Sequence, residues 1–167
     1  AAQGRSALRI VPFDPALREH FYRLNEAWLR KYFYVEEIDH RVLSNPETEI
    51  LRSGGAILFA MLGDEVIGTC ALLHESDGVY ELTKMAVDEQ RQGLGIGRAL
   101  MEAAIAEFRQ RRGRRLFLET NSKLTPALRL YESMGFEHQP SIKPDSHYDR
   151  ANVYMVWHDP QGAPPVP

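Results

Sequence analysis

A glycine-rich turn is the part of this sequence whose residue types point most directly to chemistry. Gln92–Gly97 (QGLGIG) lies between an apolar, strand-like run and the start of an amphipathic helix, and Arg91 and Arg98 flank it. Glycines allow a tight turn and a close approach of a ligand to the backbone, because no Cβ is in the way. The free amides at a helix N-terminus favour an anion. The turn therefore predicts a phosphate or pyrophosphate site, with a ligand-free connection as the alternative.

The spacing of the glycines separates the classes of phosphate ligand. A dinucleotide fingerprint requires GxGxxG, but after Gly93 and Gly95 the third glycine comes one place early, at Gly97, and Arg98 takes its place. Glu119 lies near the distance expected of a ribose-binding acid, yet that fold requires parallel βαβ units upstream, where this sequence predicts antiparallel hairpins. No Gly-Lys-Ser/Thr follows the glycines, which excludes a P-loop. We therefore reject the dinucleotide hypothesis.

Other reactive side chains are sparse. Cys70 is the only cysteine, so no internal disulfide can form, and its apolar surroundings indicate a small buried side chain rather than a nucleophile. The six histidines lack HxxxH or HExxH spacing, so no metal site is expected.

The elements around the turn follow from apolar periodicity. Three apolar, partly alternating runs precede it and are joined by short turn-like segments, which predicts an antiparallel meander over residues 56–62, 66–73 and 79–87. A helix over 97–112 follows, with an i,i+4 pair of Arg98 and Glu102 and an end at Gly113. The next strand, at 116–120, requires a crossover and hence at least one parallel pair.

Cap and turn residues predict the remaining elements. Asp14-Pro15 begins a helix that ends near Phe33, and Thr125-Pro126 caps a helix that ends at Gly135. The other predicted elements are a strand at 8–11, a short helix at 36–43, a turn or two after Asn45-Pro46, and strands at 136–138 and 153–158. The expected fold class is α/β (α+β), a central mixed, mostly antiparallel sheet of about seven strands flanked by helices, in the order β-α-α-β-β-β-α-β-α-β-β. We expect residues 1–160 to form one domain and 161–167 to be a proline-rich tail.

Charge and hydropathy limit the partners. The net charge of −3 gives no overall basic field to attract nucleic acid or an anionic membrane surface. The chain has no apolar stretch of about 18 residues and no basic-then-apolar leader, so we expect neither membrane insertion nor secretion and place the protein in the cytoplasm.

Two segments resemble the motifs of the GNAT acetyltransferase superfamily. Residues 81–101 (ELTKMAVDEQRQGLGIGRALM) resemble its coenzyme A motif, Gln/Arg-x-x-Gly-x-Gly/Ala, which Gln92, Gly95 and Gly97 match. Residues 118–136 (LETNSKLTPALRLYESMGF) resemble its second motif, a helix end of the form aromatic-Tyr-x-x-x-Gly-Phe, here with leucine in the aromatic place. The order of the elements agrees along nearly the whole chain.

The resemblance implies the GNAT fold, acetyl-CoA as cosubstrate and no metal. It assigns the pantetheine arm to the strand backbone of Met85, Ala86 and Val87, and the pyrophosphate to the amides of Gln92, Gly93, Leu94, Gly95, Ile96, Gly97 and Arg98. Asn121 is expected beside the pantetheine, where the sheet splays open, and the Tyr131 hydroxyl near the thioester sulfur. Leu124 is a departure, since many relatives carry asparagine there, while others use an asparagine in the same ETN context.

The chemistry of acetyl transfer suggests two catalytic residues. The reaction needs an unprotonated amine, aligned reactants, a stabilised oxyanion and a proton for the leaving thiolate. Tyr131 is the predicted acid, with simple core packing as the alternative, and Glu81 is the predicted base, directly or through water, with a structural ion pair as the alternative. The oxyanion donor is expected to be an amide near Met85 or Ala86. Strand alternation places Glu81, Thr83 and Met85 on one face and Leu82, Lys84 and Ala86 on the other.

The acceptor cleft is expected between the early helices and the last strands. Candidate acceptor residues are Glu26, Trp28, Tyr32, Tyr34, His147, Tyr148, Arg150 and Asn152. Arg150 can clamp a carboxylate, which would favour an amino acid or peptide, or it can form an ion pair with Asp149 or another acid. Trp28, on the apolar helix face, is expected in the core.

These observations predict an N-acetyltransferase that moves the acetyl group of acetyl-CoA to a primary amine of a small molecule, amino acid or peptide by direct attack in a ternary complex. The alternatives are a protein lysine or N-terminal acetyltransferase, favoured by an open cleft, and a non-catalytic acyl-CoA sensor, against which Tyr131 and Glu81 argue. Family analogy adds a homodimer as an expectation.

Overall fold

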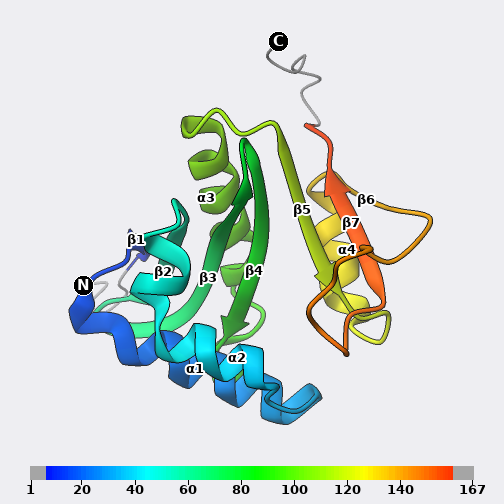
Figure 1. Cartoon of the computed structure of the whole chain (residues 1–167). Coiled ribbons are helices and arrows are strands. Elements are labelled where there is room, and N and C mark those ends of the chain that lie inside the picture. The colour runs from blue at the N-terminus through cyan, green and yellow to red at the C-terminus, as the bar shows by residue number, and fades with distance from the viewer. Residues whose placement is uncertain (1–6, 160–167) are drawn as a thin grey trace.

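The computed structural model describes residues 7–159, and the proline-rich segment 161–167 lies outside this range. The described residues form a seven-stranded mixed sheet with the strand order β1-β2-β3-β4-β5-β7-β6 (Figure 1). The strands are β1 Leu8–Pro12, β2 Ala56–Leu62, β3 Glu65–Ser76, β4 Val79–Val87, β5 Arg115–Thr120, β6 Phe136–His138 and β7 Val153–Trp157. The helices are α1 Arg18–Tyr32, α2 Glu37–Ser44, α3 Ile96–Gln110 and α4 Thr125–Ser133. The predicted α/β class and mostly antiparallel sheet are confirmed.

Strands β2, β3 and β4 form the antiparallel meander that the short connections predicted, and β1 pairs antiparallel with β2 at its edge. Gly63 and Gly78 have φ of 62° and 73° in the two hairpin turns, a region that a residue without Cβ enters at little cost. Asp14 accepts a hydrogen bond from the Ala16 amide (2.9 Å) at the start of the 3₁₀ turn Pro15–Leu17, which leads into α1. Within residues 7–159 no helix is long and apolar enough to cross a membrane.

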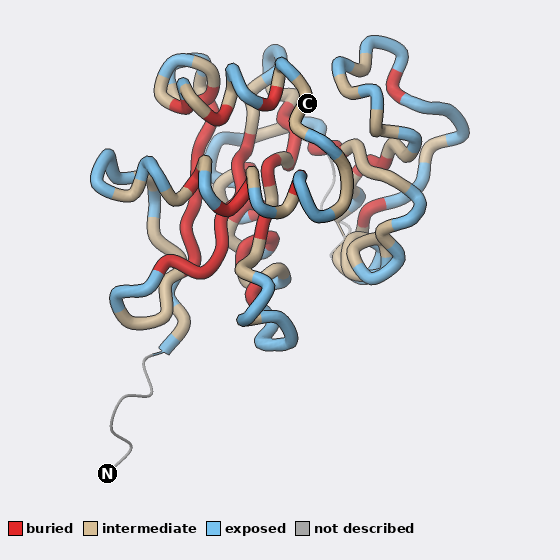
Figure 2. Tube along the Cα trace, turned by 90° about the horizontal axis from the view of Figure 1, so that it is seen from below, coloured by how far each residue is buried: buried red, intermediate tan, exposed pale blue. Residues whose placement is uncertain are grey.

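Each face of the meander buries its own apolar cluster. One cluster lies under α3 and joins Leu100, Met101 and Phe108 to Leu82 of β4 and Leu116 of β5. The other lies under α1 and α2. Figure 2 shows the buried residues running along the central strands between these layers. The part of the sheet built by β2, β3 and β4 is therefore covered on both faces.

The parallel pair β4–β5 is short. Pairing covers only Val79↔Arg115, Tyr80↔Leu116 and Glu81↔Phe117. Beyond this point the two strands diverge, and β5 continues alongside β7 (Figure 1). The divergence opens the sheet directly after Glu81.

A bulge in β4 overturns the predicted alternation of its side chains. Thr69 pairs with Ala86 and Ala71 with Thr83, so two steps along β3 correspond to three along β4, and Lys84 has a φ of 56°. The extra residue reverses the pleat. Met85 therefore packs with Leu82 in the cluster under α3, whereas Lys84 reaches the opposite face. The prediction that Met85 shares a face with Glu81, and Lys84 with Leu82, was wrong because it assumed an unbroken period of two.

Candidate functional site

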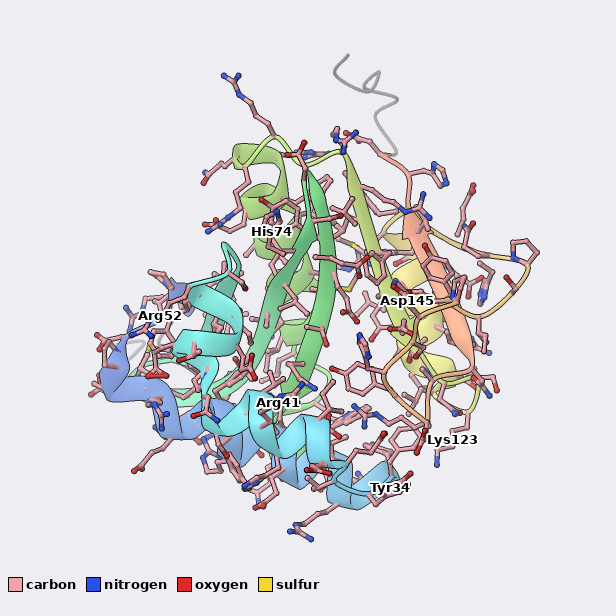
Figure 3. All side chains as sticks on the ribbon, viewed as in Figure 1. Tyr34, Arg41, Arg52, His74, Lys123 and Asp145 are labelled. Atoms are coloured by element: carbon pink, nitrogen blue, oxygen red, sulfur yellow. The ribbon has the colours of Figure 1, made fainter. Side chains whose placement is uncertain are left out.

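A pocket lies where β4 and β5 diverge, and we call it the splay pocket. Its walls come from α1, β4, β5, α4 and the segment before β7, including Asn25, Trp28, Phe33, Glu81, Thr83, Lys84, Met85, Glu119, Asn121, Tyr131, Tyr148 and Arg150. Figure 3 shows the side chains that fill this gap, with Tyr34 and Lys123 labelled near one end of it and Asp145 on the segment that passes in front of β5. The splay pocket has a volume of about 90 Å³, which suits the reactive end of a small ligand.

The glycine turn at the start of α3 offers open backbone amides. Gly95 is the N-cap of α3 with a φ of 73°, and Gly93 has a φ of 86°. A Cβ added at either would meet nothing within 4 Å, so the backbone faces open space. The first helical bond runs from the Ala99 amide to the Gly95 carbonyl (3.0 Å), which leaves the preceding amides without carbonyl partners in the helix. Such a cradle of backbone amides can hold an anion.

The two arginines beside the turn are engaged with other residues. Arg91 forms an ion pair with Glu65 (2.6 Å). Arg98 donates to the Ser133 hydroxyl (3.0 Å) on α4, and the predicted pair with Glu102 does not form. Anion binding at this turn would therefore rest on the backbone.

Glu81 is buried in the splay pocket without a partner. Its exposed fraction is 6%, and no side chain among residues 7–159 donates a hydrogen bond to it or forms an ion pair with it. Burial, assisted by the nearby Glu119 carboxylate, raises the pKa of Glu81 to about 8, against the opposing pull of Lys84. The geometry thus gives no support to the alternative of a structural ion pair. A carboxyl group with such a pKa is ionised, and so can accept a proton, increasingly as the pH rises toward 8.

Tyr131 lines the same pocket from α4. Its ring packs edge-on against Phe136, with 6.2 Å between centroids. Burial raises the pKa of Tyr131 to about 12, and the nearby Cys70 adds to the effect, so the hydroxyl stays protonated and can donate. Cys70 is buried, as predicted, and burial raises the pKa of its thiol to about 12.

A buried ionic network that the sequence did not reveal supports one wall. Asp39 of α2 has an exposed fraction of 0% and accepts from Lys84 Nζ (2.8 Å) and from Arg150 Nη1 and Nη2 (2.7 and 2.9 Å). Arg150 Nη1 also donates to Glu36 (2.7 Å), and Lys84 Nζ to the Tyr148 hydroxyl (3.1 Å). Burial alone would raise the pKa of Asp39, but Arg150 and Lys84 lower it to about 2.

Several predicted acceptor residues do line the splay pocket. Tyr148 and Arg150 are present in its walls, although Arg150 pairs with Asp39 and Glu36 and not with Asp149. Trp28 is half-buried, packs against the apolar cluster under α1 and α2, and also lines the splay pocket. Asn121 lies there as expected, where its amide donates to the Arg150 carbonyl (2.8 Å) and its oxygen accepts from the Lys123 amide (3.0 Å).

The other candidates lie outside the splay pocket. Glu26 pairs with Arg30 (3.4 Å) and lines a separate surface hollow between α1 and α2. Tyr32 lines a neighbouring hollow beside the residues that follow β4. His147 and Tyr34 are exposed, and Asn152 donates to the Ser122 hydroxyl (3.3 Å).

Two wall residues were not predicted to bind the acceptor. Asn25 of α1 is 3% exposed, and its amide donates to the Phe21 carbonyl (3.0 Å). Glu119 of β5 was considered only as a ribose-binding acid, but it faces the splay pocket. Its ETN context was the available signal. In the part of the chain that the structure describes, no group of three or more His, Cys, Asp or Glu is placed to hold a metal ion.

Sequence comparison finds relatives named as a mycothiol acetyltransferase and as an N-acetylaspartate synthetase. The chain is 32% identical over 117 residues to mycothiol acetyltransferase of Acidothermus cellulolyticus, covering 70% of this chain and 33% of that protein. It is 31% identical over 107 residues to N-acetylaspartate synthetase of Homo sapiens, covering 63% and 35%. The chain therefore spans about a third of the length of these curated relatives.

Solved structures share the fold of this chain, and a family model matches most of its sequence. A GNAT-family acetyltransferase from Staphylococcus aureus Mu50 superposes with a TM-score of 0.81 at 22% identity, covering 90% of this chain and 98% of that one. The protein yncA from Salmonella typhimurium, solved with its cofactor acetyl-CoA, superposes with a TM-score of 0.73 at 20% identity, covering 96% and 99%. At these identities the likeness establishes the fold. Since the model of the Acetyltransferase (GNAT) family also matches residues 16–136, the chain belongs to that family.

Proposed function

We propose that the chain is an N-acetyltransferase that uses acetyl-CoA to acetylate a primary amine of a small molecule. One observation carries this proposal: Glu81, buried and without a partner, shares the splay pocket with the protonated Tyr131. A base and an acid in one cavity are what amine acylation by a thioester requires.

Each group has a separate task in the proposed reaction. Acetyl-CoA, when bound, supplies the acetyl thioester. Glu81 accepts a proton from the acceptor amine, directly or through water, while the amine nitrogen bonds to the acetyl carbon and the carbon–sulfur bond breaks. Tyr131 gives its proton to the departing sulfur. Amides near the bulge at Lys84 are the candidates to hold the carbonyl oxygen.

The glycine turn and the residues between it and the pocket would bind the donor. The backbone of Met85, Ala86 and Val87 leads from the splay pocket to the turn and would pair with the pantetheine arm. The amides of Gln92–Arg98 would bind the pyrophosphate. Asn121 would support the arm indirectly, because its side chain already holds the segment at Arg150.

The walls of the splay pocket favour a small acceptor over a protein. Trp28, Phe33 and Tyr148 are among its lining residues. Lys123 Nζ donates to the Tyr32 carbonyl (2.6 Å) and lies 4.1 Å from the centroid of the Phe33 ring, so α1 is tied to the loop after β5. Such crowding leaves little room for a polypeptide. The relatives named for mycothiol and N-acetylaspartate agree with a small-molecule acceptor.

Thiol release with acetyl-CoA and a panel of small primary amines tests the proposal. We expect the wild type to acetylate at least one amine, and Glu81→Gln and Tyr131→Phe each to lower kcat/KM by about 10²–10⁴-fold. Glu137→Gln, the same charge change on exposed β6, is the matched control and should retain activity. Unchanged kcat/KM in both pocket variants would refute the assigned roles.

A further inference from the structure

The cationic groups in the walls of the splay pocket are already neutralised. Lys84 and Arg150 share Asp39, and Arg150 also pairs with Glu36. The next cation along the same face, Lys143, forms ion pairs with Glu75 (3.3 Å) and Asp145. A ligand carboxylate would have to break one of these contacts to gain a counter-ion.

The carboxyl groups of the splay pocket lack partners. The side-chain carboxyl groups of Glu81 and Glu119 form no ion pair and accept no hydrogen bond from residues 7–159. The exposed fraction of Glu81 is only 6%. The side-chain oxygen of Asn25, a residue 3% exposed, accepts no hydrogen bond from these residues either. The polar atoms of the pocket that have no protein partner are therefore oxygen atoms that can accept hydrogen bonds. They suit a ligand with several N–H groups.

The two carboxylates stand on the same face of the sheet, on opposite sides of the opening. Glu81 belongs to the last β4–β5 pair, opposite Phe117. Glu119 is two residues beyond Phe117, so its side chain points to the same face, roughly 6–7 Å further along β5. Leu116 and Leu118 occupy the other face, in the cluster under α3. This places one acid at the reacting position and a second one deeper along the diverging strand.

We propose that the acceptor is a short diamine or polyamine, and that Glu119 binds the ammonium group that is not acetylated. The inference rests on the proposed function, because it assigns the reacting amine to Glu81. A carboxylate bonded to an ammonium makes a charge-assisted hydrogen bond, which is among the stronger polar contacts in a site. Glu119 is thus a specificity-determining residue, and α-amino acids with a free carboxylate are poor acceptors.

Putrescine and n-butylamine, which differ by one terminal amine, test this inference directly. With acetyl-CoA as donor, we expect kcat/KM of the wild type to be about tenfold or more higher for putrescine than for n-butylamine. Aspartate, as a dicarboxylate, should be the poorest of the three acceptors. Equal rates for the diamine and the monoamine, or a preference for aspartate, would overturn the inference.

Glu119→Gln locates the source of the preference. The substitution keeps the shape of the side chain at a half-buried position, and its thermal unfolding midpoint should match the wild type. At a pH on the plateau of the wild-type profile, we expect it to lower the ratio of kcat/KM for putrescine to that for n-butylamine about tenfold. Glu137→Gln, on exposed β6, should leave this ratio unchanged. An undiminished preference for putrescine in Glu119→Gln would contradict the role of Glu119.

Failure of the inference is distinguishable from failure of the proposed function. If acetyl-CoA binds and n-butylamine or aspartate is acetylated as well as putrescine, the enzyme stands and the diamine class is wrong. If acetyl-CoA binds but none of the three amines reacts, the diamine class is again wrong. If acetyl-CoA does not bind, the proposed function and the inference fall together.

Discussion

The glycine turn presents backbone amides, whereas the splay pocket presents charged side chains. The turn comes from one contiguous segment, a Cβ at Gly93 or Gly95 would meet no neighbour within 4 Å, and the flanking arginines are engaged elsewhere. The pocket joins α1, α4, two diverging strands and the segment before β7. One of its walls is held by ion pairs to Asp39 of α2 between residues 45 and 111 positions apart. Substitutions in the turn should therefore affect the binding of acetyl-CoA alone. Substitutions in or around the pocket should affect the stability of the fold or the rate of catalysis.

The largest expected effect is on the pH dependence of catalysis. Glu81 must be ionised to act as a base, so kcat/KM should rise with pH up to its pKa of about 8 and then level, apart from the ionisation of the acceptor amine itself. Glu81→Gln should remove this limb and lower the plateau by about 10²–10⁴-fold. Steady-state rates from pH 6 to 10 measure both.

The same substitution should not destabilise the fold. A carboxyl whose folded pKa lies above its ordinary 4.5 binds a proton more tightly when folded, so its stabilising effect is present at low pH and is lost as pH rises through about 8. Thermal unfolding of Glu81→Gln should therefore occur at least as high as that of the wild type at pH 9. A large loss of stability would mean that Glu81 has a structural role.

The next largest effect is expected on stability, in the ionic network. Asp39→Asn leaves Lys84 and Arg150 buried without their shared carboxylate, which should lower the free energy of unfolding by about 3–5 kcal/mol. Because the folded pKa of Asp39 is about 2, below its ordinary 3.8, the stabilisation should be present above pH 3.8 and be lost as pH falls to about 2. Urea unfolding at pH 7 and pH 3 measures both.

Asp145→Asn is the matched control for this network. It removes the same charge from a lysine partner, but Asp145 is exposed. Its effect should be much smaller than that of Asp39→Asn, because solvent screens the pair. Similar losses in the two variants would contradict the view that burial makes the Asp39 network costly to break.

A substitution in the glycine turn should have a smaller effect, on the affinity for acetyl-CoA. The methyl group of Gly95→Ala meets no protein atom, but it lies over the amides that would bind the pyrophosphate. Alanine must also adopt the positive φ of Gly95, which costs about 1–2 kcal/mol. We expect acetyl-CoA to bind about tenfold more weakly, by calorimetry.

Gly63→Ala controls for the backbone strain alone. Its φ of 62° is similar, and it lies in the β2–β3 turn, away from the pocket. It should lose comparable stability and keep the wild-type affinity for acetyl-CoA. Equal losses of affinity in Gly95→Ala and Gly63→Ala would show that the turn acts only through the fold.

The smallest effect is expected from Glu119→Gln on the catalytic pH profile. The Glu119 charge disfavours ionised Glu81, so its removal should move the rising limb of kcat/KM toward lower pH. A shift toward higher pH would contradict the proximity of the two carboxylates.

The order of the elements and the glycine turn could be predicted because their signals are local. Asp14-Pro15, the alternating runs and Gly93–Gly97 each act within a few residues. The bulge at Lys84 could not be predicted, since an ordinary lysine adopts a positive φ there under tertiary constraint. The capping box of Glu36 and Asp39 was visible as an acidic pair three residues apart, but nothing in the sequence joined it to Arg150. Glu26 and His147, which were expected in the acceptor cleft and lie outside the splay pocket, reflect the same lack of long-range information.

Calorimetric titration with acetyl-CoA, with NADH as the comparison ligand, tests the central claim most directly. The proposed function predicts that acetyl-CoA binds to the wild type and to Glu81→Gln, that it binds more weakly to Gly95→Ala, and that NADH does not bind. Absence of acetyl-CoA binding, or a preference for NADH, would contradict the assignment of the glycine turn and the catalytic proposal built on it.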